Sequence, residues 1–184
     1  MIEGVQVSVR KTRLLEDLRR YVPGARRLSV RIVLSTAFRQ PGFLACYLFR
    51  VADEAHSRGH GKRGQVAYLV NLAVTGADLL PGCKIGGGLL IRHANGIVIG
   101  SGAVIGKNCT ILQQVTIGAS DASFYGKQAY PLIGNSVTLG TGAKVLGNVS
   151  VGDNATIGAN AVVTHNVLPH DTVAGVPARS IGRR

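Results

Sequence analysis

"IGSGAVIGKNCTILQQVTIG", residues 99–118, places an aliphatic residue at every sixth position and a small or apolar residue at the fifth position of each six. The same spacing resumes downstream and extends upstream, with two extra residues around Ile97 that shift its phase; the leading residues are Leu79, Ile85, Ile91, Ile99, Ile105, Ile111, Ile117, Ile133, Leu139, Val145, Val151, Ile157 and Val163. A sustained period of six does not fit the 3.6-residue period of an amphipathic helix. It predicts a parallel β-helix, in which each six forms one short strand and one corner, and three sixes form a coil.

One segment interrupts the repeat. "ASDASFYGKQAY", residues 119–130, separates the six that begins at Ile117 from the six that begins at Ile133. A chain that leaves a regular stack and returns to it forms a loop, and such excursions often cover a site or reach a neighbouring subunit. We therefore predict a functional excursion loop at residues 119–131.

The N-terminal part has a different pattern. Apolar residues in residues 41–56 fall at helical spacing, as Leu44, Tyr47, Leu48 and Val51 do. Helices are also predicted for "LLEDLRRY" and for "VAYLVNLAVTGAD". We expect a mainly β protein in which an N-terminal helical cap, residues 1–77, covers the open end of a β-helix, residues 78–184.

Charge and composition limit the function classes. The net charge is +12, and residues 1–77 carry 13 Lys and Arg against 5 Asp and Glu, so this arm could contact an anionic membrane surface. Nucleic-acid binding is disfavoured, because aromatic residues are only 5% of the chain and do not alternate with the basic ones. No metal site is expected, since the cysteines lack ligand spacing, and free thiols favour a cytoplasmic location, with the inner face of the membrane as a further option; these cysteines are Cys46, Cys83 and Cys109.

His93 is the residue that the repeat does not explain. It is the third residue of its six, which places it at or near a corner and outside the apolar interior. Asp78 precedes it by fifteen residues, close enough in the repeat for the two side chains to approach each other. A carboxylate on one imidazole nitrogen leaves the other nitrogen as a general base. From spacing alone, a corner histidine without a role is an equally good interpretation.

Residues 78–118 and 131–182, from "DLLPGCKIGGGLLIRHANGIVIG" to "AGVPARSIG", closely resemble the serine acetyltransferase branch of the hexapeptide acyltransferases. This resemblance implies a left-handed β-helix, usually a homotrimer, with acetyl-CoA as co-substrate between adjacent prisms. It implies that His93 is the catalytic histidine and that Asp78 supports it. The implied chemistry is direct acyl transfer without a metal. The residues implied to contact CoA are Ala119, Thr141 and Ala159, with Lys144 and Arg179 near its phosphates.

Two departures from the serine enzymes concern the acceptor. Arg92 stands where they have an acidic residue, and Ala129-Tyr130-Pro131 stands where they have Arg-His-Pro. The sequence is therefore closer to the expected pattern of exopolysaccharide and capsule O-acetyltransferases of the colanic-acid type, and we expect a sugar hydroxyl as acceptor, with Arg92 and Tyr130 binding it. The alternatives are L-serine O-acetylation for cysteine biosynthesis and a non-catalytic scaffold.

Overall fold

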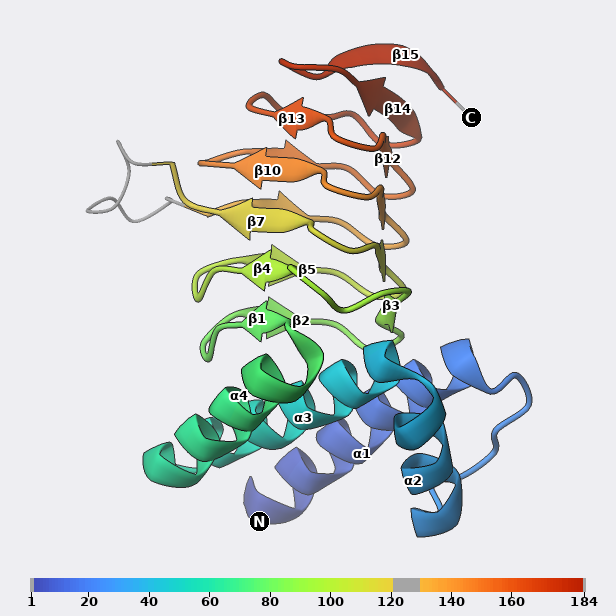
Figure 1. Ribbon diagram of the computed structural model, residues 1–184, viewed down its shortest axis with the longest axis vertical. Coiled ribbons are helices and arrows are strands. Elements are labelled where there is room, and N and C mark those ends of the chain that lie inside the picture. The colour runs from blue at the N-terminus through green and yellow to red at the C-terminus, as the bar shows by residue number, and fades with distance from the viewer. Residues whose placement is uncertain (1, 121–129, 184) are drawn as a thin grey trace.

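The computed structural model describes residues 2–120 and 130–183, with side chains from residue 12 onward (Figure 1). The helices come first: α1 (Ile2–Tyr21), α2 (Val30–Arg39), α3 (Pro41–Ser57) and α4 (Gly61–Thr75). The strands follow: β1 (Asp78–Leu79), β2 (Lys84–Ile85), β3 (Leu90–Ile91), β4 (Val98–Ile99), β5 (Val104–Ile105), β6 (Thr110–Ile111), β7 (Thr116–Gly118), β8 (Leu132–Ile133), β9 (Thr138–Leu139), β10 (Lys144–Leu146), β11 (Ser150–Val151), β12 (Thr156–Ile157), β13 (Val162–Val163), β14 (Asp171–Ala174) and β15 (Arg179–Arg183).

The strands form three sheets that run along the sides of a prism. The first sheet has the order β1-β4-β7-β10-β13, the second β11-β8-β5-β2, and the third β15-β14-β12-β9-β6-β3. Pairing is parallel except between β14 and β15, which close the C-terminal end as an antiparallel pair (Figure 1). The leading aliphatic residues stack on one another, for example Ile99 on Ile117 and Ile117 on Val145, and all three are fully buried. The parallel β-helix predicted from the period of six is confirmed.

The phase shift in the sequence has a structural counterpart. Asp78 pairs with Val98, twenty positions later, whereas Val98 pairs with Thr116, eighteen positions later. The two additional residues lie in the corner formed by residues 92–97, between β3 and β4. This corner is therefore longer than its neighbours, and it is the one that contains His93.

A buried ion pair attaches the helices to the first coil. Arg50 of α3 and Asp17 of α1 are 2% and 0% exposed, and the Arg50 Nε lies 2.9 Å from Asp17 Oδ2. Arg50 also donates from Nη1 to the Ile85 carbonyl (2.7 Å), and Asp17 Oδ1 accepts from the Leu89 amide (2.8 Å). An end coil exposes backbone groups with no further coil to pair with. Arg50 and Asp17 supply hydrogen-bond partners for two of these backbone groups, the Ile85 carbonyl and the Leu89 amide.

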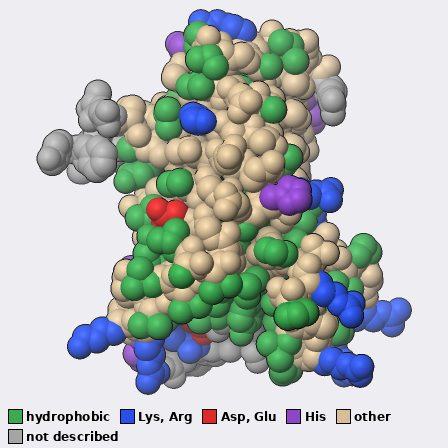
Figure 2. Space-filling model, viewed as in Figure 1, with side chains coloured by type: hydrophobic (Ala, Val, Ile, Leu, Met, Phe, Trp, Pro, Cys, Tyr) green, Lys and Arg blue, Asp and Glu red, His purple; other side chains and the backbone are tan. Residues whose placement is uncertain are grey.

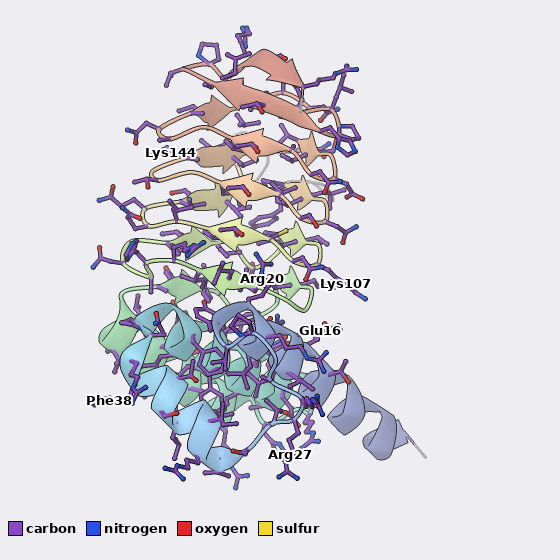
Figure 3. All side chains as sticks on the ribbon, turned by 90° about the vertical axis from the view of Figure 1, so that its right-hand side faces the viewer. Glu16, Arg20, Arg27, Phe38, Lys107 and Lys144 are labelled. Carbon is purple, nitrogen blue, oxygen red and sulfur yellow. The ribbon has the colours of Figure 1, made fainter. Side chains whose placement is uncertain are left out.

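Two more contacts close the same end. The Tyr21 hydroxyl accepts from the Ile91 amide (2.8 Å) and donates to its carbonyl (2.9 Å). Arg20 reaches from α1 to the first two coils, where it donates to the carbonyls of Gly88 and Asn108 at 2.7 Å each (Figure 3). Side chains of α1 and α3 therefore pair with backbone groups at the N-terminal end of the β-helix.

The helices depart from the sequence-based expectation in two places. α2 was not predicted, and it leaves Val30, Leu34 and Phe38 60–92% exposed along one side (Figure 3). The last predicted helix extended to Asp78, but α4 ends at Thr75 because Gly76 adopts a left-handed conformation (φ 69°) that reverses the chain. Within the described residues, no helix is both long and apolar enough to cross a bilayer.

Candidate active site

His93 lies on the long corner 92–97, where its side chain and that of Arg92 are exposed. Backbone hydrogen bonds connect this corner to the segment before β1 and to the corner of the next coil. The Gly96 amide donates to the Gly76 carbonyl (2.9 Å), and the Gln114 amide donates to the Asn95 carbonyl (3.0 Å). A rigid corner therefore presents an imidazole that needs no partner for folding, which is the arrangement expected of a reactive group.

The corners above it form a continuous edge. We call the corners that join the third sheet to the first sheet the His93 edge: residues 92–97, 112–115, 140–143 and 158–161. Backbone hydrogen bonds connect successive corners, from the Gly142 amide to the Gln113 carbonyl (2.9 Å) and from the Asn160 amide to the Thr141 carbonyl (2.8 Å). Thr141 and Ala159, both predicted CoA contacts, therefore lie two and three coils above His93, or about 10 and 14 Å along the axis.

Other predicted site residues lie elsewhere around the first sheet. Asp78 and Lys144 are in strands of that sheet, and the Lys144 Nζ donates to the Gly142 carbonyl on the His93 edge (3.0 Å). Ala119 directly follows β7, on the opposite edge of the sheet. Tyr130 also lies on the opposite edge, where its ring covers the corner 100–103 and leaves no room for a Cβ at Gly102.

Asp78 and His93 do not meet within one protomer. Among the described residues, no hydrogen bond or ion pair joins them, because Asp78 lies within strand β1 while His93 lies on the corner before β4. Instead, Asp78 Oδ1 accepts a hydrogen bond from the Tyr68 hydroxyl of α4 (2.8 Å). Burial raises the pKa of Tyr68, and the hydrogen bond to Asp78 raises it further. The approach of Asp78 to His93 predicted from the repeat is thus not seen within the chain.

The remaining predicted contact, Arg179, is at the C-terminal end. It lies in β15 and is exposed, with its Nη1 donating to the Ala178 carbonyl (3.0 Å). With His165 and Asp171 it lines a surface cavity of about 420 Å³. Most of the predicted loop 119–131 lies outside the described residues, as does Ala129. Among the described residues, no group of His, Cys, Asp and Glu could hold a metal ion.

Two residues with a place in this site were not anticipated. Gln113 lies on the His93 edge between His93 and Thr141, and its buried Oε1 has no hydrogen-bond partner in the described part of the chain. Tyr68 is the other, because only the reversal of the chain at Gly76 brings it to Asp78. The Oε1 of Gln113 is therefore a buried acceptor without a partner in the described residues.

Comparisons with known proteins agree with this architecture. A family model for the bacterial transferase hexapeptide (six repeats) matches residues 130–165. The crystal structure of serine acetyltransferase from Vibrio cholerae matches with a TM-score of 0.84 and 33% identity, covering 98% of this chain and 68% of that one. This chain belongs to the hexapeptide-repeat acyltransferase family. The left-handed β-helix of that family, with short N-terminal helices, is therefore the fold of this chain.

The hexapeptide acyltransferases most similar in sequence include serine acetyltransferases. The Escherichia coli K12 enzyme is 43% identical over 144 residues, which are 77% of this chain and 51% of that protein. The Mycobacterium tuberculosis enzyme is 39% identical over 150 residues, covering 82% of this chain and 65% of that protein. The chain thus spans about half to two thirds of the length of these relatives.

These matches correct the acceptor prediction. A structure of the Neisseria gonorrhoeae serine acetyltransferase in complex with serine matches with a TM-score of 0.83 and 31% identity, covering 98% of this chain and 72% of that one. The predicted kinship with exopolysaccharide O-acetyltransferases is not supported, and the predicted sugar acceptor is wrong. Arg92 and residues 129–131 are few positions beside the 144 residues that align with the serine acetyltransferase of Escherichia coli K12.

Proposed function

We propose that this chain is an acetyl-CoA-dependent L-serine O-acetyltransferase. The observation that carries the proposal is the exposed His93 at the foot of an edge on which Thr141 and Ala159 are stacked. The similarity to serine acetyltransferases over most of the chain supports the acceptor.

In this proposal His93 acts as general base. Its neutral imidazole takes the proton from the serine hydroxyl while that oxygen attacks the thioester carbonyl carbon of acetyl-CoA. The tetrahedral intermediate collapses, the C–S bond breaks, and the CoA thiolate receives the proton from the imidazolium. The acetyl group moves directly from sulfur to oxygen, so the enzyme forms no covalent bond to it.

The co-substrate would extend along the His93 edge. The pantetheine arm would lie along this edge, where the stacked corners present mainly backbone groups. Thr141 and Ala159 would contact the upper part of the arm, with Ala119 across the groove. Lys144 and Arg179 are the basic side chains assigned to the phosphates.

Asp78 is proposed to act on the histidine of a neighbouring protomer. His93, Thr141 and Ala159 lie on the His93 edge, whereas Asp78 lies in the first sheet. Packing the His93 edge of one protomer against the first sheet of another would bring Asp78 close to His93. A homotrimer with three such grooves has the symmetry that this requires. Asp78 Oδ2 has no hydrogen bond in the described part of the chain, so it remains open to an imidazole N–H.

Arg92 is the proposed partner of the serine carboxylate. Its guanidinium is exposed beside His93, and paired charge-assisted hydrogen bonds suit a carboxylate. We expect Arg92→Gln to raise the KM for L-serine about tenfold with little change in kcat, since such hydrogen bonds contribute to binding in both ground and transition states. Initial-rate kinetics check this, with Lys107→Gln, an exposed cation on another edge, as control. An unchanged KM would remove Arg92 from the acceptor site.

The function is tested with the purified chain. Acetyl-CoA and L-serine are mixed, free CoA thiol is measured, and the product is identified by mass spectrometry. We expect thiol release that depends on L-serine and yields O-acetylserine. Absence of serine-dependent release would refute the proposed function. The cytoplasmic location and the membrane contact of the basic arm stay predictions.

A further inference from the structure

Tyr68 occupies a place next to the proposed reaction centre that neither the repeat nor the family resemblance assigned. It lies in α4, two helical turns before Gly76, and its side chain is partly buried. Its hydroxyl lies 2.8 Å from Asp78 Oδ1. A carboxylate can only accept a hydrogen bond, so the tyrosine is the donor. Burial and the hydrogen bond to Asp78 raise the pKa of Tyr68 above that of an exposed tyrosine.

The junction between α4 and β1 is rigid. Gly76 caps the helix in a left-handed conformation, its carbonyl accepts from Gly96, and the Asp78 amide donates to the Ile97 carbonyl (2.8 Å). The backbone of Asp78 is therefore fixed to the same corner that contains His93. Only the torsion angles of the Asp78 side chain remain free, and the Tyr68 hydroxyl fixes them through one oxygen.

We propose that Tyr68 is a positioning residue that orients Asp78 toward the catalytic histidine. This inference rests on the proposed function and assigns a new residue to the same site. By occupying Oδ1, Tyr68 sets the plane of the carboxylate and leaves Oδ2 for the imidazole N–H of the neighbouring His93. A carboxylate held in one orientation loses less conformational freedom when it aligns the imidazole for proton transfer.

The test is a double-mutant cycle of Tyr68→Phe and Asp78→Asn. Tyr68→Phe keeps the ring and removes only the donor, so the helix packing is preserved. We expect kcat with L-serine to fall about tenfold, the value of one hydrogen bond to a charged group, while the KM for acetyl-CoA is unchanged. In the Asp78→Asn background, Tyr68→Phe should cause no further loss, because the residue acts through the carboxylate. Tyr47→Phe, a partly buried tyrosine in α3, is the matched control and should leave kcat unchanged.

Two kinetic outcomes overturn the inference. One is an unchanged kcat in Tyr68→Phe. The other is an equal loss in both backgrounds, which indicates a structural effect on the fold. Failure of the proposed function itself has a different signature, namely no serine-dependent turnover by the wild-type protein.

A spectroscopic measurement decides the pairing even without turnover. The ultraviolet absorbance of tyrosinate, followed against pH as the difference between wild type and Tyr68→Phe, isolates the titration of Tyr68. Because Asp78 contributes to the raised pKa, Asp78→Asn should move this titration to lower pH. An unmoved titration would show that the Tyr68–Asp78 contact is not formed in solution, and the inference falls.

Discussion

His93→Ala lowers kcat for acetyl transfer to L-serine by about a thousandfold, because a positioned general base contributes about 10²- to 10⁴-fold to such reactions. The loss appears in kcat and in kcat/KM alike, since the imidazole acts on the hydroxyl proton in the transition state. Steady-state kinetics with both substrates check this. The fold should not change, because the His93 side chain is exposed and makes no hydrogen bond in the described part of the chain.

The matched control is His56→Ala, an exposed histidine in the last turn of α3. His56→Ala should have the wild-type kcat. The circular dichroism spectra of His56→Ala and His93→Ala should be the same. The non-catalytic scaffold considered from the sequence predicts that both variants behave alike. A wild-type kcat in His93→Ala would remove His93 from the proposed mechanism, whereas the scaffold predicts no turnover by the wild-type protein or by either variant.

Asp17→Ala lowers the free energy of unfolding by about 3–5 kcal/mol, because it leaves the buried Arg50 guanidinium without its counter-charge. Arg50 is 2% exposed, so water cannot replace the carboxylate. The Leu89 amide also loses its acceptor, and a buried unpaired donor costs about 1–3 kcal/mol on its own, as part of that total. Urea unfolding followed by circular dichroism measures the change, at equal protomer concentration because assembly adds to stability.

A surface ion pair provides the comparison. Arg58 and Glu54 lie one helical turn apart, and the Arg58 side chain is 37% exposed. Arg58→Ala should cost no more than about 1 kcal/mol, since solvent screens such pairs. If the two variants unfold at the same urea concentration, the Asp17–Arg50 pair does not anchor the helices to the first coil.

Much of the fold follows from local rules. The period of six fixes which aliphatic residues point inward, and the two extra residues near Ile97 locate the long corner. The contacts that close the N-terminal end were not predictable, because Asp17 and Arg50 are 33 positions apart and helical spacing does not specify which charged residues meet. α2 was not predicted although Val30, Leu34 and Phe38 recur at every fourth residue, which is the spacing of one helix face. In the structure that face is exposed, so the apolar spacing does not mark the side that packs on the protein.

The positions of several candidate residues follow from the repeat, but the contacts between them do not. The repeat identified His93 as a residue without a structural role, and its corner position is confirmed. Residue spacing alone suggested that Asp78 lies beside His93. Asp78 is on strand β1 and His93 is on the corner between β3 and β4, so the two residues lie on different parts of the coil. Tyr68 was missed because its contact depends on the angle at which α4 ends. The prediction of a sugar acceptor was wrong because it relied on departures at Arg92 and residues 129–131, whereas the similarity to serine acetyltransferases extends over most of the chain.

The most direct test of the account asks whether His93 of one protomer works with Asp78 of another. His93→Ala and Asp78→Asn chains carrying different affinity tags are co-expressed, and trimers that contain both are isolated by two successive affinity steps. Each mixed trimer then holds one groove with an intact histidine and an intact aspartate, so the account predicts about one third of the wild-type rate of O-acetylserine formation. Mixed trimers no more active than the two parent variants would contradict it.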